Sequence, residues 1–348
     1  MDRAVLTGFD TVIDTRSPAE YAEDHLPDAV SCPVLDDVER AQVGTMYKQV
    51  SPFDAKKAGA ALVARNIARH IEERFADKPQ GWRALVYCWR GGKRSGAMVH
   101  VLREIGWDAG QLDGGYKAYR RYVVEQLARL PAQFDFRVLC GATGSGKSRL
   151  LRALAVADAQ VLDLEDLAAH RGSVLGGLPE RPQPAQKLFE TLVWQRLSRF
   201  DPQRPVYLEG ESRKIGQLQV PEALINAMRA SQCILVEAGL ATRVELLLDE
   251  YSHYRADRAA LGAQLDCLAD LHGRGRIGEW KALAEQGEWQ RFVERLLVEH
   301  YDPAYRRSAK RNYAKLPQAA RLQVKIAGEA GFARLARTLV ANQEAIPA

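Results

Sequence analysis

Long hydrophobic runs are missing from this sequence of 348 residues. No stretch approaches the roughly 18 consecutive apolar residues that span a bilayer as a helix. The first residues also lack the basic and apolar segments that together form a secretory signal peptide. We therefore expect a cytoplasmic protein that works without entering a membrane, and we expect it to be a monomer.

Cysteine is scarce, and the five residues of this type are widely spaced: Cys32, Cys88, Cys140, Cys233 and Cys267. An odd number with no Cys-x-x-Cys pair argues against a disulfide framework and against a cysteine-ligated zinc site, so we expect no bound metal of that kind. Most thiols of this sort behave as small buried apolar groups. The sequence around Cys88 makes that residue the exception.

The composition, with 47% hydrophobic and 27% charged residues, is that of an ordinary globular protein. Its length suits about two domains. Strand-like and helix-like segments alternate in two successive blocks, which predicts mostly parallel sheets covered by helices. We expect one α/β domain over residues 1–130 and a second over residues 131–348. Beyond Thr242 the chain looks wholly helical, with no strand expected.

The stretch VYCWRGGKRSG, from Val86 to Gly96, places a cysteine between a strand and a helix. Only a thiolate is a good nucleophile, so a reactive cysteine needs a lowered pKa. Nearby cations, loop N–H groups and a helix N-terminus all favour the thiolate and also bind an anion. The alternative is a buried structural cysteine, which the glycines and cations argue against. The candidate site comprises Cys88, Arg90, Gly91, Gly92, Lys93, Arg94 and Ser95.

A second glycine-rich stretch, GATGSGKS, fits the pattern G-x-x-x-x-G-K-[ST] of a phosphate-binding loop between a strand and a helix. Its backbone N–H groups and the helix dipole attract phosphate oxygens. Lys147 adds a full positive charge, and Ser148 suits Mg²⁺. Whether magnesium or a nucleotide occupies the loop stays open, since no base-recognition motif is present. The diphosphate-binding candidates are Gly141, Thr143, Gly144, Ser145, Gly146, Lys147 and Ser148.

Acidic and basic side chains follow two further candidate strands of the second domain. The carboxyl ends of parallel strands line the ligand crevice, and a P-loop protein keeps an acid there for a metal or an attacking group. These supporting residues are Asp163, Glu165, His170 and Arg171 after one strand, and Glu209 and Glu211 after the other. The alternative for each is an ordinary residue at a strand end or in a loop.

Positive charge is unevenly distributed in this chain of net charge +5. Basic residues are in excess between Tyr301 and Lys325, where Tyr301, Tyr305 and Tyr313 are interleaved with them. Cations bind phosphates and aromatic rings stack on bases, so this pattern suits a nucleic-acid surface. A solvated amphipathic helix is the alternative. The candidates for RNA contact are Arg306, Arg307, Lys310 and Arg311.

Two segments of the first domain carry a resemblance: VIDTRSPAEYAEDHLPDAVSCPV near its start and QLDGGYKAY near its end. They are similar to the opening segment and to the closing Gly-Gly-aromatic segment of a rhodanese domain. Cys88 then falls at the rhodanese nucleophile. One feature departs from common sulfurtransferases, because Arg94 follows the cysteine by six positions and not by five. The longer spacing resembles rhodanese-fold phosphatases and suits a group larger than a bare sulfur.

Six motifs follow one another along most of the chain: ERAQVGTMYKQ, CWRGGKRSG, LDGGYKAYR, GATGSGKS, HRGSVLGG and EGESRKIG. With these motifs, a rhodanese domain joined to a P-loop domain resembles the tRNA 2-selenouridine synthase family. Asp28, in place of the usual glycine, is the clearest departure.

The resemblance implies an enzyme that replaces the sulfur of 2-thiouridine at position 34 of tRNA with selenium. Geranyl diphosphate first alkylates the sulfur, and selenophosphate then supplies selenium, with Cys88 carrying it as a selanyl-cysteine. The implied partners are tRNA, selenophosphate and geranyl diphosphate, with no tightly bound cofactor. Two alternatives remain: a sulfurtransferase or phosphatase fused to an ATP-dependent kinase, and a non-catalytic RNA-binding or nucleotide-sensing module.

Overall fold

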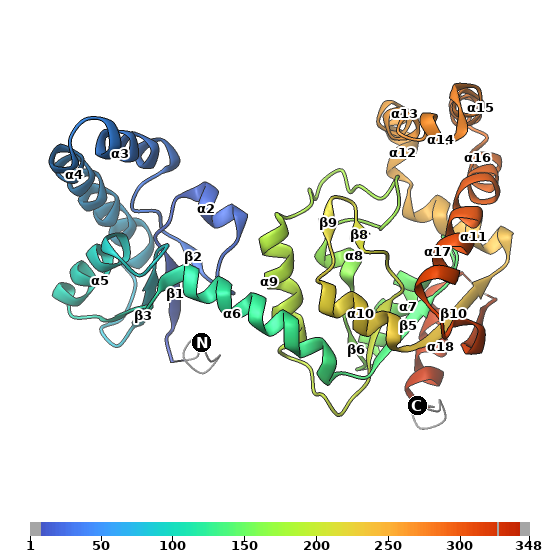
Figure 1. Ribbon diagram of the computed structural model, residues 1–348, viewed down its shortest axis with the longest axis horizontal. Coiled ribbons are helices and arrows are strands. Elements are labelled where there is room, and N and C mark those ends of the chain that lie inside the picture. Colours follow the sequence, from blue (N-terminus) through green and yellow to red (C-terminus); the bar gives the residue numbers. More distant parts are fainter. Residues whose placement is uncertain (1–7, 326, 342–348) are drawn as a thin grey trace. The chain divides into compact units, whose positions relative to one another are not determined.

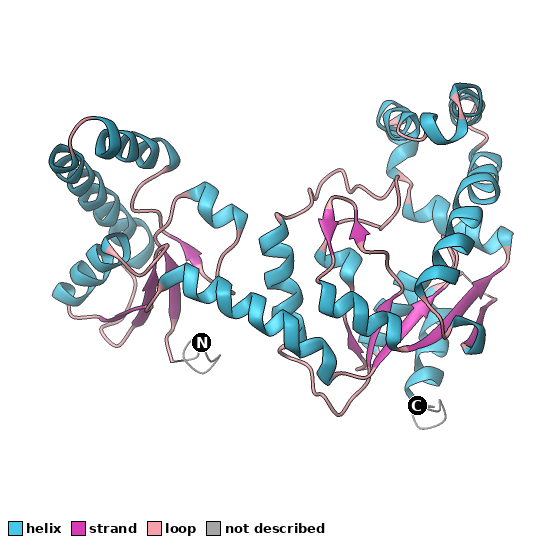
Figure 2. Cartoon of the chain, in the orientation of Figure 1, coloured by secondary structure: helices cyan, strands magenta, loops and turns pink. Residues whose placement is uncertain are grey.

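Parallel β-sheets surrounded by helices make up this chain, for which a computed structural model describes residues 8–325 and 327–341. Figure 2 shows the strands in magenta and the helices in cyan. The contacts group the chain into two compact units. The first consists of Met1–Gln126 and Pro184–Gln195, and the second of Leu127–Gln183 and Arg196–Ala348. The expected α/β class is confirmed, whereas a domain boundary at residue 130 stays a prediction.

The first unit is built on a four-stranded sheet in the order β2-β1-β3-β4, and Figure 1 labels its strands β1, β2 and β3. Its strands, all parallel, are β1 (Thr11–Asp14), β2 (Val30–Ser31), β3 (Arg83–Tyr87) and β4 (Asp108–Gln111). Asp14 of β1 pairs in register with Tyr87 of β3. Because these two central strands are parallel, they end at the same edge of the sheet, and Cys88 follows β3 there.

Helices enclose this sheet, and several begin or end where the sequence predicts. They are α2 (Pro18–Glu23), α3 (Asp37–Gln49), α4 (Pro52–His70) with its π-helical extension (Ile71–Phe75), α5 (Lys93–Ile105) and α6 (Gly115–Arg129). Helix α5 ends as expected at Gly106, whose φ of 103° is in the left-handed region that glycine tolerates. Ile13, Val86 and Met98, all fully buried, belong to the core between sheet and helices.

A helix distant in sequence completes the first unit. Helix α9 (Gln186–Leu197) lies beside α6, where the Trp194 ring meets Tyr119 edge-on at a centroid distance of 5.8 Å. Arg120 of α6 forms an ion pair with Glu190 of α9. Apolar and charged contacts therefore both attach this later segment to the first unit, although nearly all neighbouring residues in the sequence belong to the second.

The second unit contains a five-stranded parallel sheet in the order β11-β10-β5-β7-β6. The strands are β5 (Phe136–Cys140), β6 (Gln160–Val161), β7 (Val206–Glu209), β10 (Gln232–Ala238) and β11 (Ala320–Val324), and a small hairpin is formed by β8 (Lys214–Ile215) and β9 (Leu218–Gln219). Strand β5 is central and completely buried. The loop that follows it is therefore held by strands on both sides.

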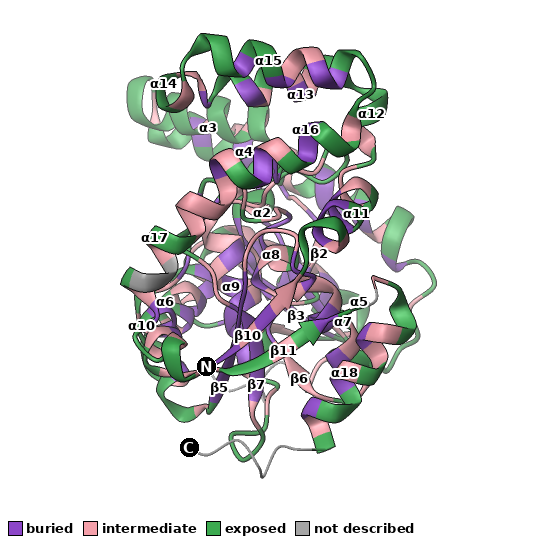
Figure 3. Cartoon of the chain, turned by 90° about the vertical axis from the view of Figure 1, so that its right-hand side faces the viewer, coloured by how far each residue is buried: buried purple, intermediate pink, exposed green. Residues whose placement is uncertain are grey.

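Strand β11 contradicts the expectation that the chain has no strand beyond Thr242. It pairs in parallel with β10, with Ile234 opposite Ala320 and Ala238 opposite Val324. Figure 3 shows β11 largely green, whereas β5 and β7 are purple and β10 is partly purple and partly pink. An edge strand pairs on one side only and needs few apolar residues, so this segment lacked the apolar run by which the other strands were recognised.

The helical C-terminal region of the second unit is confirmed. The helices of this unit are α7 (Lys147–Val156), α8 (Leu164–Leu167), α10 (Glu222–Ala230), α11 (Leu240–Glu250), α12 (His253–Ala256), α13 (Arg258–Asp266), α14 (Ala269–His272), α15 (Arg274–Glu285), α16 (Trp289–Leu296), α17 (Asp302–Asn312) and α18 (Glu329–Ala341), with short 3₁₀ turns at Leu130–Gln133 and Leu316–Gln318 and a π-helical turn at Leu297–Tyr301. A second hydrophobic core, centred on Trp280, unites α11 to α16. Within the described residues, no helix has the length and apolar character needed to cross a membrane.

Candidate functional site

The cysteine loop, residues 88–92, is shaped by the turn that precedes α6. A Cβ at Gly115 would lie 2.3 Å from the carbonyl oxygen of Cys88, and a Cβ at Gly91 would lie 2.6 Å from that of Leu112. Both glycines also have positive φ angles. The N–H of Tyr116 donates to the carbonyl oxygen of Cys88 at 2.9 Å. The closing Gly-Gly-aromatic segment therefore fixes the backbone of the loop by direct contact, which only glycine permits here.

Hydrogen-bond donors surround the sulfur of Cys88, a residue that is only 3% exposed. The N–H of Gly92 donates to Sγ at 3.2 Å and the hydroxyl of Ser95 donates at 3.1 Å. Burial raises the pKa of the Cys88 thiol, but the Ser95 hydroxyl and backbone N–H groups lower it more, so the net pKa lies below the ordinary value. The loop thus favours the thiolate, as a nucleophile requires.

Gln111 was missed by sequence reasoning, because the strand β4 that carries it was not recognised. Its side-chain nitrogen donates to the Ser95 hydroxyl at 2.9 Å and to the carbonyl oxygen of Gly92 at 3.0 Å. These two bonds orient Ser95 toward the sulfur. Gln111 is therefore a positioning residue for the thiol.

The sequence predicted that all three cations of the loop act on the thiol by charge, but the structure distinguishes Arg94 from the other two. Arg94 forms a bidentate ion pair with Glu20, at 2.7 Å for the shorter contact, and Arg40 contacts the same carboxylate. Burial raises the pKa of Glu20, but Arg94 lowers it more, so the carboxyl has a reduced pKa. Much of the Arg94 charge is therefore balanced within the protein. Arg90 and Lys93 are exposed, and their charges face solvent.

The Asp-x-Arg signature of the first strand has a structural role. Arg16 is 1% exposed and forms an ion pair with Asp14 at 2.6 Å. Its guanidinium also donates to the carbonyl oxygen of Asp24 at 2.6 Å and lies 3.9 Å from the centre of the Tyr116 ring. Breaking a buried pair of this kind typically costs about 3–5 kcal/mol. Arg16 thereby fixes Tyr116, which in turn contacts the cysteine loop.

The phosphate loop, residues 141–148, connects β5 to α7 as the motif predicts. A Cβ at Gly141 would lie 2.4 Å from the carbonyl oxygen of Val236, so this glycine is required by the neighbouring strand β10. Lys147 donates to the carbonyl oxygen of Gly141 at 2.8 Å, inside its own loop. The hydroxyl of Ser145 is buried and has no hydrogen-bond partner among the described residues. A lysine, an unpaired hydroxyl and a helix N-terminus are thus available to an anion.

Carboxylates gather beside the phosphate loop, at the ends of β6 and β7. Glu165 accepts a hydrogen bond from the Ser148 hydroxyl at 3.1 Å, and Glu209 accepts one from the N–H of Glu165 at 3.1 Å. A Cβ at Gly172 would lie 2.8 Å from an oxygen of Glu165 and 2.9 Å from one of Glu211. The structure therefore brings the carboxylates after β6 together with those after β7.

Burial and mutual repulsion raise the pKa values of these carboxyl groups. Burial and the charge of Glu211 raise the pKa of Glu165 to about 8. Burial, followed by the charge of Asp163, raises the pKa of Glu209 well above its ordinary value, and burial also raises the pKa values of Asp163 and Glu211. In the part of the chain that the structure describes, no group of three or more His, Cys, Asp or Glu side chains is arranged to hold a metal ion.

His170 and Arg171 lie in the loop after α8, in different surroundings. The N–H of Gly172 donates to Nδ1 of His170 at 3.1 Å, and burial lowers the pKa of this histidine. The guanidinium of Arg171 donates to the carbonyl oxygen of Glu250 and lies 4.8 Å from the centre of the Tyr251 ring. Arg171 therefore holds the end of α11.

Exposed cations occur on α17, but the tyrosines near them are not all available to bases. Arg306, Arg307 and Arg311 are exposed, while the side chain of Lys310 lies outside the described residues. The hydroxyl of Tyr313, a residue only 4% exposed, donates to the carbonyl oxygen of Glu211 at 2.9 Å. The expectation of base stacking is therefore wrong for Tyr313, because interleaving with cations did not reveal which side chains face inward.

Comparisons with known proteins agree with this two-loop arrangement. A rhodanese-like domain model matches residues 3–122, and the model of the tRNA 2-selenouridine synthase AAA domain matches residues 134–269. The chain is 33% identical to a Marinobacter nauticus protein over 84% of this chain and 87% of that one. The chain belongs to the tRNA 2-selenouridine synthase family.

Two other relatives carry the same family name. A protein of Shewanella halifaxensis is 30% identical over 87% of this chain and 90% of its own length. A Nitrosomonas europaea protein is more similar, at 38% identity over 69% of this chain, but the matched part is 63% of that protein. The expected relationship of this chain to tRNA 2-selenouridine synthases is confirmed.

Proposed function

We propose that this enzyme converts 2-thiouridine at wobble position 34 of tRNA to 2-selenouridine, by S-geranylation from geranyl diphosphate and then selenation from selenophosphate. The name that these relatives share, tRNA 2-selenouridine synthase, supports the overall conversion. The observation that carries the two-step form is the presence of two anion-binding loops of different chemistry. One holds an activated thiol, and the other holds a lysine but no cysteine.

The first step is assigned to the phosphate loop. The sulfur of thiouridine forms a bond to C1 of the geranyl group, the C–O bond breaks, and diphosphate leaves with the electron pair while the base loses its N3 proton. Lys147, the Ser145 hydroxyl and the N-terminus of α7 stabilise the negative charge that develops on the leaving group. The nearby carboxyl groups do not repel the diphosphate while they stay protonated.

The second step is assigned to the cysteine loop. Selenium enters at C2 of the base as a nucleophile, and the C–S bond breaks so that geranylthiol leaves. Selenium has the same oxidation state in selenophosphate and in 2-selenouridine. Forming a selanyl-cysteine would require an added oxidant, and releasing its selenium as a nucleophile would then require an added reductant. The balanced route has the Cys88 thiolate attack phosphorus, which releases selenide with the electron pair, and water then releases phosphate from the cysteine. Arg90 and Lys93 provide charge for the phosphoryl oxygens.

Contact with the tRNA is assigned to the exposed face of α17. Arg306, Arg307 and Arg311 supply cations there that suit phosphates. Such contacts give affinity without base specificity and become weaker as salt increases. Lys310 belongs to the same cluster in sequence.

The test is mass spectrometry of nucleosides from thiolated tRNA incubated with the purified enzyme. With geranyl diphosphate alone we expect S-geranyl-2-thiouridine, and with selenophosphate added we expect 2-selenouridine. ATP turnover without either product would contradict the proposal and favour a kinase fused to a sulfurtransferase or phosphatase. Salt-sensitive tRNA binding without product would favour a non-catalytic binding module. Phosphorus-labelled selenophosphate should label Cys88; selenium label on the protein in its place would support the selanyl-cysteine.

A further inference from the structure

A tryptophan lies directly beside the nucleophile of the cysteine loop. Trp89 follows Cys88, and it is the one aromatic residue between positions 88 and 96, where glycines and cations otherwise predominate. Its side chain is half-buried, so part of the ring is open to a ligand. Neither the activation of the thiol nor the binding of the phosphoryl group uses this ring.

The Trp89 ring is held by neighbours that are themselves fixed. Its centre lies 5.3 Å from that of the Tyr116 ring, at an interplanar angle of 35°. The Arg16 guanidinium lies 3.9 Å from the centre of the Tyr116 ring, and the Tyr116 hydroxyl donates to Asp24 at 2.8 Å. The carbonyl oxygen of Trp89 accepts a hydrogen bond from the N–H of Lys117 at 2.9 Å. A ring that is already oriented costs a ligand less ordering entropy when it binds.

Positive charge predominates in the segments next to this ring. Arg90 and Lys93 in the loop and Lys117 at the start of α6 are exposed, and Asp113 is the one exposed acid within residues 88–93 and 113–117. Proteins that bind unpaired nucleotides combine cations for the phosphates with aromatic rings on which the bases stack. A wobble uridine, which belongs to the unpaired part of the anticodon loop, is a base of this kind.

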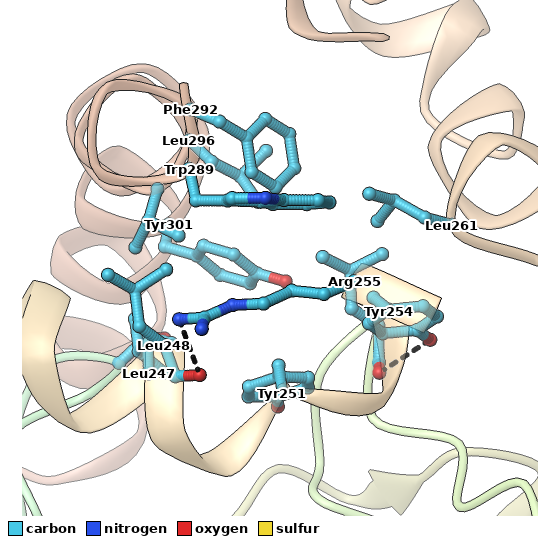
Figure 4. A pocket seen from close by; sticks show the side chains of 13 residues that line it. Leu247, Leu248, Tyr251, Tyr254, Arg255, Leu261, Trp289, Phe292, Leu296 and Tyr301 are labelled. Atoms are coloured by element: carbon cyan, nitrogen blue, oxygen red, sulfur yellow. Dashed lines mark hydrogen bonds between the residues drawn. The ribbon is translucent and has the colours of Figure 1, made fainter. Parts of the chain in front are cut away.

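The cavity that Thr143 of the phosphate loop lines offers no comparable platform. Its volume is about 50 Å³, whereas small-molecule sites typically measure roughly 300 Å³ or more. Figure 4 shows the Arg255 side chain extending between the Trp289 and Tyr301 rings on one side and Tyr251 on the other. A base could therefore enter this space only if the Arg255 side chain moved.

We infer that the Trp89 ring is the surface on which the target pyrimidine stacks during the selenation step. The inference rests on the proposed function and adds the residue that would hold the base. Stacking fixes the plane of the pyrimidine beside Cys88, so that C2 is presented to the selenium released there. Trp89 is in this respect a binding residue for the base, while Cys88 reacts with selenophosphate.

Binding of two anticodon stem-loop RNAs to the full chain tests this inference. One RNA carries S-methyl-2-thiouridine at position 34, which has the alkylated ring without a hydrocarbon tail, and the other RNA lacks base 34. The unaltered enzyme should bind the first RNA about tenfold more tightly, as expected for one base stacked on an aromatic ring. In Trp89→Ala we expect both RNAs to bind equally, with the affinity that the unaltered enzyme has for the RNA without the base.

Three further variants and one reactivity measurement make the test specific. Trp89→Phe should restore most of the preference, Trp89→Leu should not, and Phe53→Ala, which removes a 68% exposed ring at the start of α4, should behave as the unaltered enzyme does. The pH profile of Cys88 alkylation by iodoacetamide should be the same in Trp89→Ala as in the unaltered enzyme.

The inference is overturned if Trp89→Ala or Trp89→Leu keeps the tenfold preference, or if the unaltered enzyme has none. A changed alkylation profile in Trp89→Ala would also overturn it, because the ring would then act by shaping the cysteine loop. Failure of the proposed function is a separate result: the unaltered enzyme would form no 2-selenouridine from geranylated tRNA, even where the RNA-binding pattern holds.

Discussion

The cysteine loop and the phosphate loop have the same backbone plan, but they differ in which of their polar side chains already have hydrogen-bond or ion-pair partners. Each follows a buried central strand and leads into a helix N-terminus. In the first, neutral donors point at the sulfur of Cys88, and Arg94 is paired with Glu20. In the second, Lys147 bonds to its own loop and the Ser145 hydroxyl has no partner among the described residues. The hydrogen bonds of the first loop favour the thiolate of Cys88, whereas the second loop has an unpaired hydroxyl that is available to an anion.

The acids beside the loops differ in the same way. Glu20 is ionised by its arginine partners, and so it stabilises a fixed cation near the thiol. Glu165 and Glu209 have raised pKa values because burial and other carboxylates surround them. Similar glycine-rich motifs can thus carry opposite electrostatic arrangements.

Removing the sulfur of Cys88 should have the largest effect on activity, and it would distinguish the role of the cysteine loop from that of the phosphate loop. In Cys88→Ala we expect no 2-selenouridine but a normal yield of S-geranyl-2-thiouridine, because only the second step uses the thiol. Nucleoside mass spectrometry measures both products. Cys267→Ala, which removes an exposed cysteine, is the control. Selenation at the normal rate in Cys88→Ala would show that the thiol is not the nucleophile.

Lys147→Ala is the reciprocal experiment, and we expect it to cause a large but incomplete loss of geranylation activity. Losing one preorganised positive group that stabilises the leaving diphosphate should lower the rate of geranylation on the order of 10²–10³-fold. Selenation of tRNA that has already been geranylated should continue. Lys214→Ala, at an exposed position, provides the comparison. Equal loss of both reactions in Lys147→Ala would mean that the loops do not work separately.

Ser95→Ala tests whether neutral donors activate the thiol. Without the hydroxyl hydrogen bond to Sγ, the pKa of Cys88 should rise by roughly one unit. The rate of alkylation by iodoacetamide near neutral pH should then fall about tenfold, and it should equal that of the unaltered enzyme at high pH, where both thiols are ionised. An unchanged pH profile would mean that Arg90 and Lys93, and not the Ser95 hydroxyl, lower the pKa of Cys88.

Glu165→Gln tests the raised pKa of this carboxyl group through the pH dependence of the free energy of unfolding, and we expect it to affect activity least. Because the pKa of Glu165 in the folded chain is about 8 and lies above its ordinary value, the folded state holds a proton that the unfolded state has released. This contribution is complete below pH 4.5 and is lost as pH rises to about 8. Relative to the unaltered protein, the variant should gain about 3 kcal/mol between pH 5 and pH 8. Urea denaturation at both pH values measures it, and a constant difference would contradict the raised pKa.

Local patterns predicted the two loops, since each depends on glycines and on a buried strand a few residues away. The ionic partner of Arg94 was not predictable, because Glu20 is brought to it only by the folded sheet. The inward orientation of Tyr313 depends on the position of Glu211, which is equally remote in sequence. Strand β11 was missed for a further reason, because its pairing with β10 compensates for a weak strand signal.

Helix α9 has a consequence for the way the chain folds during synthesis. The first unit includes Pro184–Gln195, so it lacks a helix when residue 126 has been made. Translation adds roughly 5–20 residues per second, and residues 127–183 must therefore emerge over several seconds before Trp194 can cover Tyr119. During that interval Tyr119 on α6 lacks the ring contact that Trp194 later provides.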